Sequence, residues 1–137
     1  EDWNKAIDRA NKEADILFVT HYHTLKDKNG LIVEPRKVIE ATEPRLEIPA
    51  IGSWGFYVED GGMMAVAVSP YEQGEEAARM AIKVIEDGVS PRDIPVQTSH
   101  LFVIYIREAS LKRRHLHVPG LIEAFARATN NYFEEVH

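Results

Sequence analysis

The chain has 137 residues, of which 45% are hydrophobic and 28% are charged, and its formal net charge is −6. This composition is typical of one globular domain and excludes disordered, collagen-like and coiled-coil classes, while the acidic balance argues against a nucleic-acid partner. The chain contains no cysteine, which excludes disulfides, thiolate nucleophiles and Cys-ligated metals.

The first third of the chain predicts two helices and two strands. Apolar residues recur with helical spacing through residues 3–14, and Asp2 is the expected N-cap of that helix. Residues 16–20 form a short apolar run, which is typical of a strand buried on both faces of a parallel sheet. A short helix over residues 35–41 and a second buried strand over residues 48–52 follow.

The sharpest local signal lies in the middle of the chain. A third strand is predicted over residues 63–68, and Ser69 follows it. Ser69, Pro70 and Glu72 form the pattern of a capping box, with Ser at the N-cap, Pro at the first helical position and Glu three residues after the cap. The helix is expected to end at Gly88, because glycine favours the position after a helix.

A fourth strand over residues 102–106 and an amphipathic helix over residues 121–133 complete the predicted elements. Two prolines and several polar residues mark a break near 90–99. Apolar strands that alternate with helices predict an α/β fold, with a mostly parallel sheet and helices on both faces.

Two His-x-His pairs, His21 with His23 and His115 with His117, raise the alternative of a metalloenzyme. Residues two apart on a strand face the same side, so each pair could supply two zinc ligands. The pattern stops there, because Leu25 stands where a further acidic ligand is needed. Polar residues at a strand end and on a surface turn are the favoured interpretation.

The sequence shows no catalytic constellation, so we expect a protein that is not an enzyme. Ser53 does not lie in a G-x-S-x-G nucleophile motif, because Ile51 occupies the first glycine position. The glycine patterns that bind nucleotide phosphates are also missing from the sequence.

Polar and aromatic residues follow three of the predicted strands. In open parallel sheets, ligands bind in the crevice outside the carboxyl ends of the strands. Two interpretations stay open, namely a ligand site or local core packing with Ser69 acting only as a cap. The candidate ligand-binding residues are His21, Tyr22, Ser53, Trp54, Phe56, Tyr57, Ser69 and Tyr71.

These residue types favour a small carboxylate with an apolar side chain, such as an amino acid. Aromatic walls stack on flat or apolar groups, and each such contact contributes about 0.5–1.5 kcal/mol beyond area burial. Hydroxyls and a helix N-terminus at Ser69 suit a carboxylate. Either Phe56 or Tyr57 is expected to face the ligand, because neighbours on an extended segment point in opposite directions.

Four stretches, 53–58, 66–78, 82–88 and 90–96, resemble in order the ABC-transporter substrate-binding protein family, which has the type I periplasmic-binding fold. The helix that begins Tyr-Glu-Gln-Gly at Tyr71 is the most specific of these. Some members of the family bind tryptophan and other aromatic amino acids. The basic run 112–115 departs from the family pattern.

The resemblance covers only the second half of the family's two-lobe fold. It implies a C-terminal ligand-binding lobe over residues 1–98, with a hinge-return strand and C-terminal helices over residues 99–137. The chain opens on Glu1 without an initiator Met, so an excised fragment or a processed product is expected.

The implied partners are a small-molecule ligand, the missing N-terminal lobe and an ABC permease, with no cofactor. The implied location is periplasmic or extracytoplasmic, with a lipoprotein as one form of the parent. An extracytoplasmic sensor domain of a signalling protein is the alternative function. Apolar surface exposed without the other lobe predicts self-association of the fragment.

Overall fold

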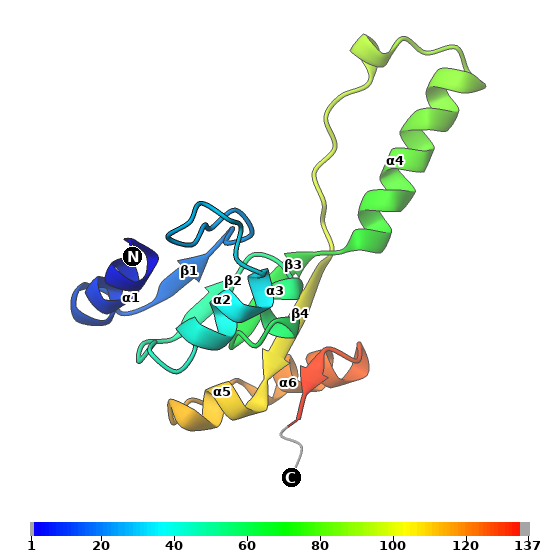
Figure 1. Cartoon of the computed structure of the whole chain (residues 1–137). Helices are drawn as coiled ribbons and strands as arrows, with labels where there is room; N and C mark the ends of the chain where they lie inside the picture. Colours follow the sequence, from blue (N-terminus) through cyan, green and yellow to red (C-terminus); the bar gives the residue numbers. More distant parts are fainter. Residues whose placement is uncertain (1, 135–137) are drawn as a thin grey trace. The chain divides into compact units, whose positions relative to one another are not determined.

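A computed structural model describes residues 2–134 (Figure 1). The elements in chain order are α1 (Asp2–Glu13), β1 (Leu17–Val19), α2 (Pro35–Thr42), β2 (Ala50–Gly52), α3 (Phe56–Glu59), β3 (Met64–Val68), α4 (Pro70–Ile85), a 3₁₀ turn η1 (Pro91–Asp93), β4 (Phe102–Arg107), α5 (Glu108–Arg113), α6 (Gly120–Ala128) and β5 (Tyr132–Phe133). Asp2 lies in the first turn of α1 and is therefore a helical residue rather than the predicted N-cap.

The chain divides into two compact units. Unit 1 comprises residues 1–67 and 103–137, and unit 2 comprises residues 68–102. The predicted division at residues 98 and 99 falls inside unit 2. The predicted division separates a ligand-binding lobe from a hinge-return strand with C-terminal helices, and it stays a prediction.

The sheet has five strands in the order β1-β2-β3-β4-β5. The pairs β1–β2, β2–β3 and β4–β5 are parallel. The β3–β4 pair is antiparallel, because Arg107 N donates to Met63 O at 2.9 Å whereas Ser69 N donates to Leu101 O at 3.1 Å. The mostly parallel α/β fold predicted from the sequence is therefore confirmed, with one antiparallel junction that was not predicted.

Two core clusters lie on opposite faces of the sheet. Ala65 belongs to one cluster, and its neighbour Met64 packs against the other, because successive strand residues face opposite sides. The first cluster takes residues from α1, α2 and α3, and the second takes residues from α5 and α6. Helices on both faces are thus confirmed. Within residues 2–134, no helix combines the length and the apolar character that a membrane crossing requires.

The predicted last helix is wrong in its second half. The helix α6 ends at Ala128, and Asn130 adopts a left-handed conformation with φ of 58°. Asparagine tolerates this conformation and commonly ends helices. The N–H of Asn131 then bonds to Ala126 O at 2.8 Å, and the chain continues as β5 beside β4.

The start of α4 confirms half of the predicted capping box. Ser69 Oγ accepts a hydrogen bond from Glu72 N at 3.3 Å, as an N-cap should. The Glu72 carboxylate does not bond back to Ser69, because it accepts from His100 N and Leu101 N, each at 2.9 Å. At the other end, Gly88 takes the expected left-handed conformation with φ of 67°.

Candidate ligand-binding site

Five aromatic rings gather where β1 and β2 end. The two strands are parallel with Val19 opposite Gly52, so the residues that follow them emerge at the same edge of unit 1. The Ser53 N–H donates to Val19 O at 3.1 Å and holds the segments that follow β1 and β2 side by side. We call these rings the strand-end aromatic cluster: His21, Tyr22, His23, Trp54 and Phe56.

The rings of the strand-end aromatic cluster contact one another in sequence. Trp54 and Phe56 stack with an interplanar angle of 9° and a centroid separation of 6.0 Å. His23 meets Phe56 edge-on at 4.6 Å and stacks on Tyr22 at 4.6 Å. His21 lies edge-on to Trp54 at 6.2 Å. Each ring is therefore held by at least one other, which preorganises the outer face.

Tyr22 anchors the strand-end aromatic cluster to the core. Its side chain is 1% exposed, and its hydroxyl donates to Asp60 Oδ2 at 2.6 Å. Burial raises the pKa of Tyr22, and the hydrogen bond with Asp60 raises it further. The phenol therefore stays protonated around neutral pH and keeps donating to the carboxylate.

Trp54 provides the accessible wall of the site. It is 38% exposed, whereas Phe56 beneath it is half-buried. The loop reaches this position because Gly55 passes directly over Tyr105 of β4, where an added Cβ would lie 2.4 Å from the ring. A larger residue at position 55 would push the Trp54 loop off this ring.

Tyr57 occupies the core instead of the outer surface. It is 2% exposed, and its ring lies so close to Gly52 and Gly62 that a Cβ on either would come within 2.5 Å of it. Burial raises the pKa of Tyr57, with nearby Glu43 as the next cause. Residues 56–59 form the helix α3, so the expectation of an extended segment was wrong. Both rings contact the aromatic cluster: Phe56 stacks with Trp54 at its outer side, and buried Tyr57 meets Tyr22 edge-on at 6.3 Å from the core.

Ser53 is the residue that immediately precedes Trp54 in the chain. Within residues 2–134, its hydroxyl is buried and has no hydrogen-bond partner. Buried polar atoms in folded proteins almost always find a partner, so this hydroxyl would gain one only from a polar group that displaces the atoms covering it.

Ser69 and Tyr71 lie in unit 2. The Ser69 side chain is committed to capping α4, and the Glu72 carboxylate already lies near that helix start. Tyr71 is 89% exposed. Their membership in the same site as Trp54 stays a prediction.

The two His-x-His pairs lie in loops, so the strand spacing that suggested paired zinc ligands does not apply. His21 and His23 follow β1, and His115 follows α5 with φ of 53°. No group of three or more His, Asp or Glu side chains in the described part of the chain is arranged to bind a metal.

Sequence reasoning missed three contributors. His23 was weighed as a metal ligand and as one of the polar and aromatic residues after the first strand, but it was left out of the ligand-binding candidates although its position beside Tyr22 was a usable signal. Asp60 and Tyr105 come from α3's end and from β4, and only the fold brings them to Tyr22 and Gly55.

Comparison with known proteins gives one family and several solved structures. The family model described as ABC transporter substrate binding protein matches residues 6–129. The comparison with curated proteins finds no match.

The solved structures share the fold at low sequence identity. A conserved domain protein from Vibrio cholerae aligns at 18% identity with a TM-score of 0.64, over 90% of this chain and 39% of that one. The ligand-free, open structure of CD0873, a substrate-binding protein with adhesive properties from Clostridium difficile, aligns at 21% identity with a TM-score of 0.62, over 98% and 40%. An ABC domain in complex with L-Trp from Streptococcus pneumonia aligns at 14% identity with a TM-score of 0.60, over 97% and 41%. The chain thus spans about two fifths of each of these structures.

Proposed function

Because the chain belongs to the family of ABC transporter substrate-binding proteins, we propose that it supplies one lobe of a solute-binding protein that delivers a small ligand to an ABC permease. Its place of action is the periplasm or the outside of the cytoplasmic membrane. The family match favours uptake over the alternative of a signalling sensor.

The strand-end aromatic cluster carries this proposal. Trp54 offers an accessible ring backed by Phe56, and the unpartnered hydroxyl of Ser53 lies next to it in the chain. A flat or apolar side chain suits the rings, and a polar group suits the hydroxyl. We therefore propose an amino acid with an aromatic or other apolar side chain as the ligand. One structure of the same fold is a complex with L-Trp, which supports this class.

A lone lobe presents one wall of the site. The chain spans about 40% of the structures that share its fold, so the opposite wall is proposed to come from the remainder of such a protein. The 137-residue chain alone is then expected to bind amino acids weakly or not at all, because half of the ligand's surface stays in water.

The experiment is a calorimetric titration of the two-lobe protein with L-tryptophan, L-phenylalanine, L-leucine and D-glucose. Trp54→Ala should weaken binding of the preferred amino acid at least tenfold, consistent with the loss of about 1.4 kcal/mol or more of stacking and burial. Phe18→Ala is the matched control, since Phe18 is 63% exposed on β1 and belongs to no ring contact of the aromatic cluster.

Two results would contradict the proposal. Normal binding by Trp54→Ala across the amino-acid panel would show that Trp54 is not a wall of the site. Tight binding of an amino acid by the 137-residue monomer would show that no opposite lobe is needed.

A further inference from the structure

Unit 1 contains a second cavity, which shares no residue with the strand-end aromatic cluster. It has a volume of about 350 Å³ and lies between the first turn of α1, the loop that joins β1 to α2, and one side of α2. We call it the α1–α2 cavity, and its apolar lining consists of Trp3, Leu25, Val33, Val38 and Ala41. Cavities of this size accept small molecules in many proteins.

The Trp3 indole is held in one orientation at the α1–α2 cavity. Trp3 Nε1 donates to Thr42 Oγ1 at 2.8 Å, and that hydroxyl donates to Val38 O at 2.6 Å. The side chains of Leu25 and Val33 pack against the first core cluster and stay partly exposed. The apolar wall is therefore formed before a ligand arrives, which lowers the entropy cost of binding.

Two lysines give the α1–α2 cavity an excess of positive charge. Lys26 and Lys37 both line it and are exposed, and Asp2 is the one acidic residue among its described lining residues. The Lys26 ammonium forms no hydrogen bond or ion pair within the part of the chain that the structure describes. Lys37 pairs with Glu34 at 3.3 Å, where both side chains are exposed, and such pairs contribute little free energy. Both ammonium groups are therefore available to an anion.

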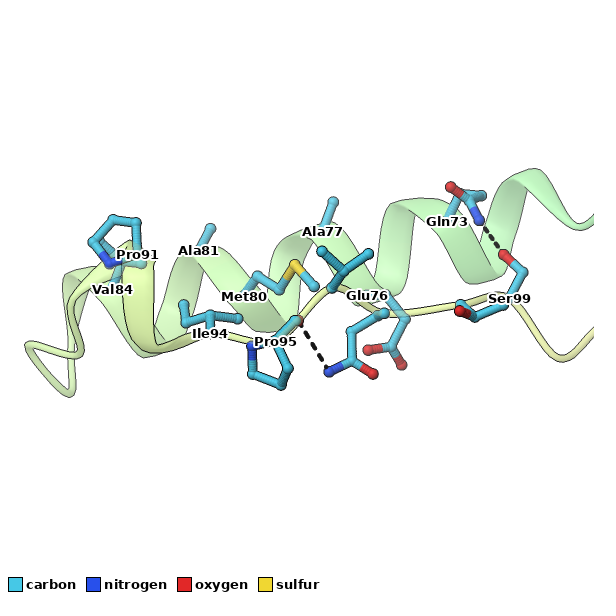
Figure 2. A pocket seen from close by; sticks show the side chains of 13 residues that line it. Gln73, Glu76, Ala77, Met80, Ala81, Val84, Pro91, Ile94, Pro95 and Ser99 are labelled. Atoms are coloured by element: carbon cyan, nitrogen blue, oxygen red, sulfur yellow. Dashed lines mark hydrogen bonds between the residues drawn. The ribbon is translucent and has the colours of Figure 1, made fainter.

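The larger groove in unit 2 has the opposite charge. It has a volume of about 510 Å³ between α4 and residues 91–99, and Figure 2 shows Met80 turned toward Ile94 and Pro95 there. Glu76 is the one charged residue among the described residues that line it, so a carboxylate would be repelled. The positive charge of the α1–α2 cavity is thus a local feature, in a chain whose net charge is −6.

We propose that the α1–α2 cavity binds a small monocarboxylate with an apolar body, such as an arylacetate. The apolar body packs on the Trp3 indole, and the carboxylate oxygens accept hydrogen bonds from Lys26 and Lys37. A cation of the same shape is disfavoured, because the two lysines outnumber Asp2. The proposal does not depend on the proposed function, because no residue of this cavity belongs to the strand-end aromatic cluster.

Trp3 fluorescence tests the proposal in the 137-residue chain. The chain has two tryptophans, so Trp54→Phe leaves Trp3 as the single tryptophan. Phenylacetate should then change the Trp3 emission with a saturable dependence on its concentration. The amine 2-phenylethylamine, which has the same ring and a positive charge, should not. No saturation by phenylacetate up to about 10 mM, or equal saturation by the amine, would overturn the proposal.

Paired lysine variants test the role of charge at the α1–α2 cavity. The double variant Lys26→Gln with Lys37→Gln should weaken phenylacetate binding at least about tenfold, because two charge-assisted hydrogen bonds are lost. The double variant Lys12→Gln with Lys28→Gln removes the same charge from two residues that do not line the cavity, and it should leave the affinity unchanged. Circular dichroism checks that both variants fold. Equal weakening by the two double variants would show a general effect of net charge and would contradict the proposed site.

Two further titrations locate the bound phenylacetate. In calorimetry, Trp54→Ala should bind phenylacetate as tightly as Trp54→Phe does, whereas binding weakened by about tenfold would place the ligand at the strand-end aromatic cluster and overturn the proposal. The Trp54→Ala form of the two-lobe protein should show the same affinity. Loss of binding there would show that the longer polypeptide fills the α1–α2 cavity itself, which would also overturn the proposal.

Discussion

Arg114 ties α5 to the loop that follows α2. Its side chain is 3% exposed, and its guanidinium donates to Ile48 O at 3.0 Å, to Leu46 O at 2.8 Å and to Glu43 Oε1 at 2.6 Å. The basic run at 112–115, which departs from the family pattern, thus includes a buried structural residue. Arginine suits this role because its planar donors can reach several acceptors at once.

Replacing the Arg114 guanidinium should destabilise the folded chain. Arg114→Met should lower the free energy of unfolding by about 3 kcal/mol, because it removes the shorter of the two arginine contacts of the mostly buried Glu43 carboxylate and the donors of the Ile48 and Leu46 carbonyls. Arg113 still reaches Glu43 Oε1 at 3.1 Å and Leu46 O at 3.5 Å, so the carboxylate keeps one weaker partner. Urea unfolding followed by tryptophan fluorescence measures the change. Arg9→Ala is the control, because its ion pair with Glu13 is 71% and 69% exposed, and a change within about 0.5 kcal/mol is expected. A similar small change for Arg114→Met would show that the buried contacts carry no stability.

At the scale of elements, Glu72 links the start of α4 to residues 100 and 101, which lead into β4, inside unit 2. Hydrogen bonds from the backbone N–H groups of His100 and Leu101 lower the pKa of Glu72 below its usual value of 4.5. A carboxyl group whose pKa is lowered by folding stabilises the folded form at pH values above its pKa in the unfolded chain. This contribution to stability is lost as the pH falls through the lowered pKa of the folded form.

The Leu101 amide should report this titration. Its proton chemical shift is expected to change once on acidification, with a midpoint below 4.5, because the carboxylate it bonds becomes protonated there. The measurement is a series of two-dimensional NMR spectra between pH 7 and acid. Glu72→Gln should remove the transition, and Glu75→Gln, which changes an exposed carboxylate paired with Arg79, should leave it. A Leu101 midpoint at or above 4.5 would contradict the linkage.

The elements predicted from sequence are those with local causes. The helix α4 was predicted because Ser69 caps it and Gly88 ends it, and β1 to β4 were predicted because their apolar runs are continuous. The reversal of β4 relative to β3 depends on pairing across the sheet, which no local pattern encodes. The same holds for the second half of the capping box, where a contact 28 residues away outcompeted the local one.

The candidate site was predictable only in part for the same reason. Trp54 and Phe56 follow a strand end, and the parallel-sheet rule was enough to place them together with His21. The burial of Tyr57 could not be read from alternation, because residues 56–59 turn into a helix over Gly52 and Gly62. Asp60 reaches Tyr22 across 38 positions of sequence.

For the molecule as a whole, the two units differ in what stabilises them. Unit 1 contains both core clusters, whose buried residues run from Ile7 to Ala126. The helix α4 of unit 2 contains no buried residue. We therefore expect unit 1 to account for nearly all of the cooperative unfolding of the chain.

The antiparallel pairing of β3 with β4 has a consequence for engineering. Because these neighbouring strands run in opposite directions, unit 2 is topologically an oversized hairpin loop, and a short turn can close the same stem. Replacing residues 70–100 with Asn-Gly, which keeps the hydrogen-bonded pair Ser69 and Leu101 on either side of the turn, should therefore leave a miniaturised domain with an unfolding free energy within about 1 kcal/mol of the parent chain, since the excised part adds little core. Loss of the cooperative urea transition would show that the excised part is needed for folding. The stem also offers a site where a reporter domain with closely spaced termini can be grafted into the chain.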